Sequence, residues 1–201
     1  DFKRPWKRFT MFEVIQHYTG IDISQMDLSA LKQVATQLGI VYDKAANEAN
    51  LIDDIFGSQC EPQLIQPTFI TDYPVAMSPL AKRHRDNPSL VERFEVICNG
   101  KELCNAFSEL NDPLDQRRRF EEQLAFHQQG DEEAMPLDED FLRALSYGMP
   151  PTVGLGIGID RLAMIMTNTA SIQEVLFFPQ MKPESRDNSS AEEAVIDEPL
   201  A

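Results

Sequence analysis

The first quarter of the chain places its hydrophobic residues at the spacing of helices. Thr10-Met11-Phe12-Glu13 has the form of a capping box, which predicts a helix from Met11 to about Tyr18. A second apolar stretch repeats three and four residues apart over 28–38. A third is expected after Asp43, which can cap it, and before Gly57. Residues 11–57 therefore predict a compact helical module.

Beyond this module the pattern changes to the shorter repeat of strands. Thr68–Thr71 predicts a short strand, and residues 93–98 alternate so that Phe94, Val96 and Cys98 share one side. Asn99-Gly100 follows, the strongest short-range signal for a hairpin, so a second strand is expected from Lys101.

The last third of the chain returns to helices around one further strand. Asp112-Pro113 and Asp138 each fit the start of a helix. Residues 153–158 alternate glycine with aliphatic residues and lead into an apolar helical run over 162–166. Hairpin-joined strands with helices between them predict an α+β fold built on an antiparallel sheet.

Composition narrows the class of protein. The 201 residues include 33 acids and 18 bases, a net charge of −15, which argues against a broad nucleic-acid-binding surface. No apolar run approaches the roughly 20 residues of a membrane span, so no membrane partner is expected. Three cysteines without a CxxC pair disfavour a zinc site or a disulfide framework and suit the cytoplasm. Residues 184–201 are acidic and aperiodic, which predicts a disordered tail.

Two glutamates of the predicted hairpin are the first candidates for a site. A two-residue turn at Asn99-Gly100 pairs Ile97 with Glu102 and Glu95 with Cys104, which makes Glu95 and Glu102 diagonal neighbours on one face. Two carboxylates at about 7–8 Å repel each other unless a cation lies between them, and such a pair suits phosphate-bound Mg²⁺. The alternative is a solvent-facing hairpin with ordinary surface acids.

The second strand of the hairpin carries three more candidates, but out of phase with Glu102. Asn105, Phe107 and Glu109 share a parity that would send them to the opposite face of a straight strand. If all serve one pocket, a β-bulge must lie between Glu102 and Asn105.

The glycine-rich strand is the third candidate. Gly154, Gly156 and Gly158 leave one face bare, so a flat ring could rest against the backbone. Arg161 follows near the start of a helix, where an anion is favoured. The alternative is a structural role, in which the glycines only relieve crowding where the strand crosses the helix. The spacing fits neither a P-loop nor a dinucleotide fingerprint.

These segments together resemble the class II lysyl-tRNA synthetases, over nearly everything from Phe9 to Pro183. Residues 154–161 resemble the motif 3 that all class II synthetases share, whereas Asn105–Asp112 is more specific to the lysyl enzymes. The resemblance is carried by five segments: 67–74, 78–80, 93–112, 154–161 and 177–183.

The resemblance implies that lysine is activated with ATP to lysyl-adenylate and then transferred to tRNA(Lys). By position, Glu95 and Glu102 would hold the Mg²⁺ of ATP, Arg161 would be the catalytic contact to the γ-phosphate, and the three glycines would form the floor under the nucleotide.

The lysine-binding residues implied by the same resemblance lie on the second hairpin strand. Glu109 would pair with the ε-ammonium group, Phe107 would pack along the aliphatic stem, and Asn105 would bind near the carboxylate end. Residues 11–57 resemble the insertion region of these enzymes.

The resemblance covers only the part of a synthetase that follows motif 2. We therefore expect residues 1–183 to be the C-terminal portion of a catalytic domain, with little adenylation activity alone. The full-length protein would be a homodimer and would contact tRNA mostly through its N-terminal part. An elongation factor P lysine ligase and a non-catalytic paralogue are the alternatives, and Ser108–Asp112 favours the tRNA enzyme.

Overall fold

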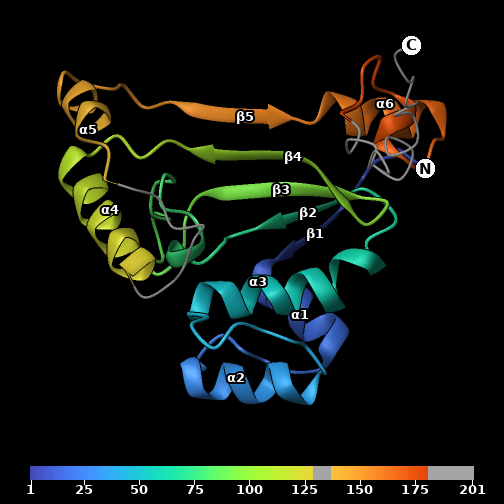
Figure 1. The fold of residues 1–201 in the computed structure, drawn as a ribbon, viewed down its shortest axis with the longest axis horizontal. Coiled ribbons are helices and arrows are strands. Elements are labelled where there is room, and N and C mark those ends of the chain that lie inside the picture. Colours follow the sequence, from blue (N-terminus) through green and yellow to red (C-terminus); the bar gives the residue numbers. More distant parts are fainter. Residues whose placement is uncertain (129–136, 181–201) are drawn as a thin grey trace, which may run out of the picture.

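The computed structural model describes residues 1–128 and 137–180, and it centres on one five-stranded sheet with the order β1-β2-β3-β4-β5. Helices flank this sheet at its ends and beyond one edge, as Figure 1 shows. The strands are β1 (Lys7–Thr10), β2 (Thr68–Thr71), β3 (Arg93–Cys98), β4 (Lys101–Ser108) and β5 (Val153–Ile157). The helices are α1 (Met11–Thr19), α2 (Leu28–Gln37), α3 (Glu48–Gln59), α4 (Pro113–Gln128), α5 (Glu139–Ser146) and α6 (Ile159–Thr167), with short 3₁₀ turns at Glu61–Gln63, Val75–Met77 and Ile172–Glu174. The predicted α+β class is confirmed.

The sheet is antiparallel at three of its four strand pairings. β2–β3, β3–β4 and β4–β5 run antiparallel, as predicted, whereas β1 pairs with β2 in parallel. The pattern of residues 7–10 did not predict β1, because its four residues lead directly into α1. The hairpin turn at Asn99-Gly100 is confirmed, with φ of 56° and 65° at the two residues. A turn with two positive φ angles matches the twist of the strands it joins.

The β-bulge required by a shared pocket is present in the hairpin. Ile97 pairs with Glu102 as predicted, but the register then shifts, so that Val96 pairs with Cys104 and Glu95 with Asn105. The predicted pairing of Glu95 with Cys104 is therefore wrong, because Leu103 is the extra residue on β4. The bulge turns Asn105 to the face that Glu102 occupies.

The predicted helical module is confirmed as α1, α2 and α3. Thr10 and Glu13 form the predicted capping box of α1. The third helix begins later than predicted, because Asn47 caps α3 through reciprocal hydrogen bonds with Asn50, whereas Asp43 accepts a hydrogen bond from the Ala45 amide in a preceding turn. Gly57 lies inside α3 and does not end it.

The hydrophobic core joins the helical module to the middle of the sheet. Val14, Leu51 and Ile55 from the helices and Ile70 and Ile97 from the strands are fully buried in one cluster. Ile97 is the neighbour of Glu95 on its face of β3, so the module supports the strand that carries this glutamate. Figure 1 shows the three helices together beside the β1 edge.

Helices α4 and α5 begin where the sequence predicts, whereas α6 begins at Ile159, before the expected run over 162–166. Asp112 accepts hydrogen bonds from the amides of Leu114 and Asp115, and Asp138 caps α5 through the amide of Phe141. α6 starts two residues after β5 ends, with Gly158 as its N-cap residue. This short connection places Arg161 at the end of the glycine-rich strand.

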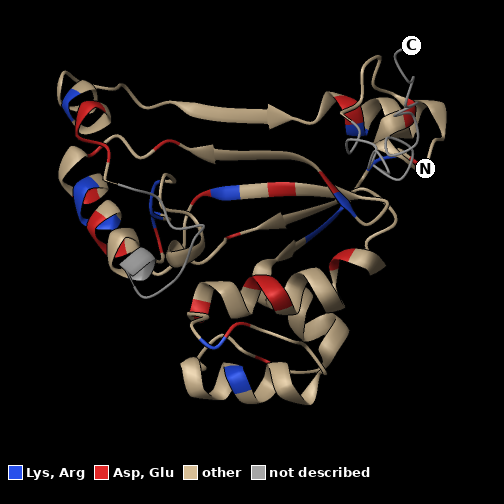
Figure 2. Ribbon diagram, in the orientation of Figure 1, with Lys and Arg blue, Asp and Glu red and all other residues tan. Residues whose placement is uncertain are grey.

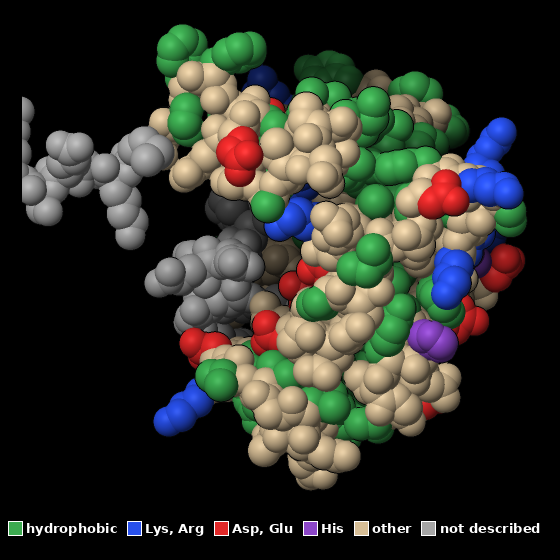
Figure 3. All heavy atoms as spheres, turned by 90° about the vertical axis from the view of Figure 1, so that its right-hand side faces the viewer, with side chains coloured by type: hydrophobic (Ala, Val, Ile, Leu, Met, Phe, Trp, Pro, Cys, Tyr) green, Lys and Arg blue, Asp and Glu red, His purple; other side chains and the backbone are tan. Residues whose placement is uncertain are grey.

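The edge strand β5 has two unlike faces. Its glycines share one face, while Val153, Leu155 and Ile157 on the other are 50–69% exposed. β5 carries no charged residue (Figure 2). Figure 3 shows hydrophobic side chains gathered along the top of the molecule, the side that carries β5 and α6. Within residues 1–128 and 137–180, these three aliphatic side chains are left uncovered.

Two further expectations concern the acidic segment 184–201 and membrane-spanning helices. The acidic segment 184–201, predicted to be a disordered tail, lies outside the described residues. No helix in the part of the chain that the structure describes has the length and apolar character needed to span a membrane.

Candidate active site

Eight of the nine predicted site residues line one cavity of about 500 Å³ on the face of β4 and β5. It is lined by Glu102, Asn105, Phe107, Glu109, Gly154, Leu155, Gly156, Ile157, Gly158 and Arg161. Residues more than 50 positions apart in the sequence thus meet at one surface. Glu95 is the predicted residue that does not line the cavity, because it is buried beside it, opposite Asn105 on β3.

The strand register explains how the glycines and the β4 side chains come to share a surface. Gly156 pairs with Asn105, and Gly154 pairs with Phe107. Directly paired residues lie on the same face, so the bare strip of β5 adjoins the polar strip of β4. Gly156 is exposed and the other two glycines are half-buried. This strip is therefore open to a ligand.

Glu109 presents an unpartnered carboxylate at one end of the cavity. Among the described residues, its side chain makes no hydrogen bond or ion pair. Partial burial raises the pKa of Glu109 above its ordinary value. Its Oε1 atom lies so close to Gly154 that a Cβ at that position would overlap it. The absence of a side chain at residue 154 therefore allows the carboxylate to occupy this place, where it could accept a cationic group.

Arg161 presents a guanidinium group at the other end of the glycine-rich strip. Its Nη1 atom donates to the backbone oxygen of Glu102 at 2.6 Å and lies 3.7 Å from Glu102 Oε2. The side chain remains 45% exposed. In the part of the chain that the structure describes, its other nitrogens make no hydrogen bond, so they are free to donate to an anion such as a phosphate.

Glu95 and Glu102 lie on one face of the hairpin, as predicted, but each already has a cationic neighbour. Arg93 Nη2 donates to Glu95 Oε1 at 2.5 Å, and Arg161 lies beside Glu102. Burial raises the pKa of Glu95, and repulsion from Glu102 adds to this, although Arg93 opposes both. The two carboxylates are therefore close enough to repel each other.

This donor set fits a hard divalent ion that is shared with phosphate oxygens. Mg²⁺ is bound through one or two carboxylates together with substrate phosphates, and it retains several waters. Residues 1–128 and 137–180 contain no group of three or more His, Cys, Asp or Glu side chains placed to hold a metal.

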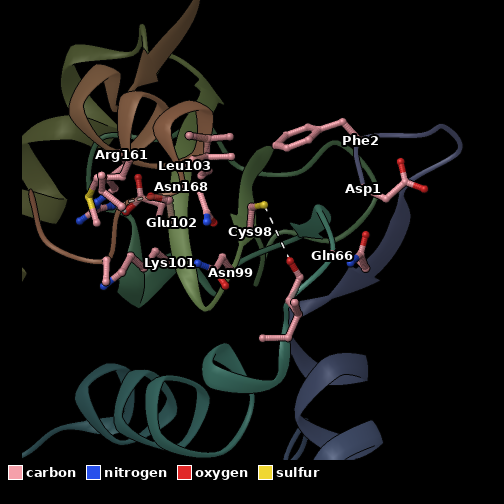
Figure 4. A pocket seen from close by; sticks show the side chains of 15 residues that line it. Asp1, Phe2, Gln66, Cys98, Asn99, Lys101, Glu102, Leu103, Arg161 and Asn168 are labelled. Carbon is pink, nitrogen blue, oxygen red and sulfur yellow. Dashed lines mark hydrogen bonds and ion pairs between the residues drawn. The ribbon is translucent and has the colours of Figure 1, made fainter. Parts of the chain in front are cut away.

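A second cavity of about 350 Å³ lies at the turn of the β3–β4 hairpin and against α6 (Figure 4). Glu102 and Arg161 line this cavity too. Figure 4 shows these two side chains together on one side of the cavity, with Asp1 and Phe2 on the other. The Glu102–Arg161 pair therefore stands between the two cavities.

Arg93 belongs to this site and was not predicted from the sequence. Arg93 shares the parity of Glu95 on β3 and so could have been placed on the same face. Its partners Met77 and Ser78 lie in a segment about 15 residues earlier in the chain, and no feature of the nearby sequence indicated that this segment contacts Arg93.

The chain is similar in sequence to known proteins over most of its length. Residues 1–182 match the family described as "tRNA synthetases class II (D, K and N)". A lysine–tRNA ligase of Porphyromonas gingivalis is 62% identical over 184 residues, which are 92% of this chain and 32% of that protein. The lysine–tRNA ligase of Christiangramia forsetii is 59% identical over 193 residues, which are 96% and 34%. The chain thus spans about a third of the length of these relatives.

Proposed function

Because this chain belongs to the class II tRNA synthetases of the D, K and N family, we propose that it is the C-terminal part of the catalytic domain of a lysine–tRNA ligase. Such an enzyme activates lysine with ATP and transfers it to tRNA(Lys). The observation that carries the proposal is one cavity with a free carboxylate at one end and a partly free guanidinium at the other. A lysine ammonium group suits the first, and the phosphates of ATP suit the second.

In the proposed reaction, the lysine carboxylate attacks the α-phosphate of ATP and pyrophosphate leaves. Glu109 holds the ε-ammonium group, Phe107 packs against the aliphatic stem, and Asn105 binds near the carboxylate. This fixes the attacking oxygen, and positioning of this kind accounts for a large share of catalysis in phosphoryl chemistry.

The nucleotide would lie along the glycine strip, with Arg161 donating to the γ-phosphate. Glu95 and Glu102 would hold Mg²⁺, which when bound neutralises phosphate charge. The terminal ribose hydroxyl of tRNA then attacks the lysyl carbonyl, and AMP leaves.

We further propose that the complete enzyme is a homodimer that acts in the cytoplasm and contacts tRNA mainly through its N-terminal part. The three free cysteines are compatible with a reducing compartment.

The function is tested by lysine-dependent exchange of pyrophosphate into ATP. The complete synthetase chain that contains these residues is expected to show exchange with lysine. Residues 1–201 alone are expected to show less than about 1% of that rate, because a missing phosphate or carboxylate contact costs several kcal/mol of transition-state binding. Exchange by the short chain at the rate of the complete one would contradict the proposal that it is a partial site.

Replacement of one glycine tests the placement of Glu109. Gly154→Ala puts a methyl group where Glu109 Oε1 lies, so the carboxylate must move. In the complete enzyme the KM for lysine is expected to rise about 10-fold to 100-fold, since a displaced charged contact costs roughly 1.5–3 kcal/mol. Gly57→Ala is the control, because a methyl group there meets nothing within 4 Å and the residue lies in α3, outside the cavity. Equal lysine KM values for the two variants would show that residue 154 has no special relation to Glu109.

A further inference from the structure

A largely covered arginine lies beside the cavity, paired on the sheet with the lining residue Phe107, and contacts residues on three segments. Arg93 Nε donates to Asn105 Oδ1 at 3.1 Å, Nη1 donates to Met77 O at 3.1 Å and to Ser78 Oγ at 2.7 Å, and Nη2 donates to Glu95 Oε1. Its guanidinium carbon lies 4.4 Å from the centre of the Tyr73 ring. The Arg93 side chain is only 16% exposed, and it is absent from the cavity lining.

These contacts fix the orientation of the guanidinium group, because each of its three nitrogens donates a hydrogen bond. Glu95 balances the charge, and the ring of Tyr73 covers the face of the group. A buried cation is tolerated when it is paired and hydrogen-bonded in this way. Arg93 is therefore held in one orientation, and it can fix the orientation of the side chains that it contacts.

The hydrogen bond to Asn105 determines which end of that amide is available. Asn105 uses its carbonyl oxygen, Oδ1, to accept from Arg93, and a guanidinium group can only donate. The amide nitrogen, Nδ2, has no hydrogen-bond partner among the described residues. Asn105 therefore offers two N–H donors to a ligand in the cavity that it lines.

We propose that Arg93 is a positioning residue that holds Asn105 with its amide N–H groups toward the carboxylate of the amino-acid substrate. The proposal rests on the proposed function, because it takes lysine as the ligand. Without this hydrogen bond the Asn105 amide could turn its carbonyl oxygen toward the substrate, and that oxygen repels a carboxylate. Arg93 thus removes the unproductive orientation without touching the substrate.

The first test is Arg93→Lys in the complete enzyme, assayed by pyrophosphate exchange. Lysine at this position keeps a positive charge beside Glu95, but it lacks the planar guanidinium group whose several N–H donors reach Glu95, Ser78 and Asn105 together. The KM for lysine is expected to rise about 10-fold, the value of one hydrogen bond to a charged group. Partial unfolding would lower the apparent kcat and leave KM unchanged, so a KM effect reports positioning. A KM within two-fold of the parent would overturn the proposal.

Arg85→Lys is the matched control. Arg85 is also paired with a glutamate, since its Nε lies 2.8 Å from Glu92 Oε1, but it is 77% exposed and lies outside the cavity. Its replacement is expected to leave the KM for lysine unchanged. An equal rise in both variants would attribute the effect to lost arginine pairs in general and would overturn the proposal.

A second variant tests the amide without altering Arg93. Asn105→Asp keeps an oxygen acceptor for Arg93 and removes the N–H donors, so the KM for lysine is expected to rise by at least 10-fold. In an Asn105→Ala background, Arg93→Lys is expected to have no further effect on this KM, because the two residues act as one unit. Additive effects, or an unchanged KM for Asn105→Asp, would overturn the proposal. Absence of lysine-dependent exchange in the parent enzyme would instead refute the proposed function.

Discussion

Glu109→Gln is expected to lower kcat/KM for lysine by about three orders of magnitude, because removal of one partner of a buried charge pair costs roughly 2–5 kcal/mol. The substitution keeps the size of the side chain and its place against Gly154 but removes the charge that would face the ε-ammonium group. Since no described residue pairs with Glu109, the variant breaks no contact within the described part of the protein. The loss would therefore report on the ligand rather than on folding.

The measurement is pyrophosphate exchange at varied lysine and ATP concentrations in the complete enzyme. The KM for ATP is expected to stay within about two-fold, because Glu109 lies at the end of the cavity away from Arg161. Glu121→Gln, a change of the same kind on the exposed surface of α4, is the control. A loss of less than about three-fold for Glu109→Gln would place the ε-ammonium group elsewhere, since three-fold corresponds to well under 1 kcal/mol.

Glu102→Gln is expected to lower the exchange rate at millimolar Mg²⁺ by about 100-fold, because a neutral amide replaces a charged ligand for a hard cation. Glu102 is 39% exposed, and its only ion-pair partner among the described residues is Arg161 at 3.7 Å. Its carboxylate is thus available to a metal ion. Part of the lost rate is expected to return at higher Mg²⁺, since weaker binding can be overcome by concentration.

The control for this variant is Glu61→Gln. Glu61 interacts electrostatically with both Glu102 and Arg161, but it lines neither of the two cavities that they share. Its replacement alters the charge near the same pair and removes no expected ligand. If both variants needed the same increase in Mg²⁺, the general negative charge of the region would explain the effect, and Glu102 would not be a specific ligand.

The hairpin shows how far the sequence alone could lead. Alternation placed Glu95 on a predicted strand, the Asn99-Gly100 turn placed Glu102 diagonally from it, and the mismatched parity of Asn105 required a bulge. The bulge is present at Leu103. These inferences succeeded because turn geometry and strand alternation are local, and together they determine which side chains share a face.

Other features depended on contacts between distant segments and could not be predicted in this way. The parallel pairing of β1 with β2 joins residues about 60 positions apart. The start of α3 was predicted wrongly, because Asp43 and Asn47 are both suitable caps and only Asn47 has a reciprocal partner in Asn50. The pairing of Arg93 with Glu95, Ser78 and Asn105 depends on how a loop folds over β3.

A crystal structure with both substrates would show whether one cavity holds lysine at Glu109 and ATP at Arg161, as we propose. The complete enzyme would be crystallised with lysine and a non-hydrolysable ATP analogue. We predict the ε-ammonium nitrogen within hydrogen-bond distance of the Glu109 carboxylate, and the γ-phosphate within hydrogen-bond distance of the Arg161 guanidinium group. Lysine or the nucleotide bound instead in the cavity beside Cys98 and Asn168, with Glu109 left unpaired, would contradict the account.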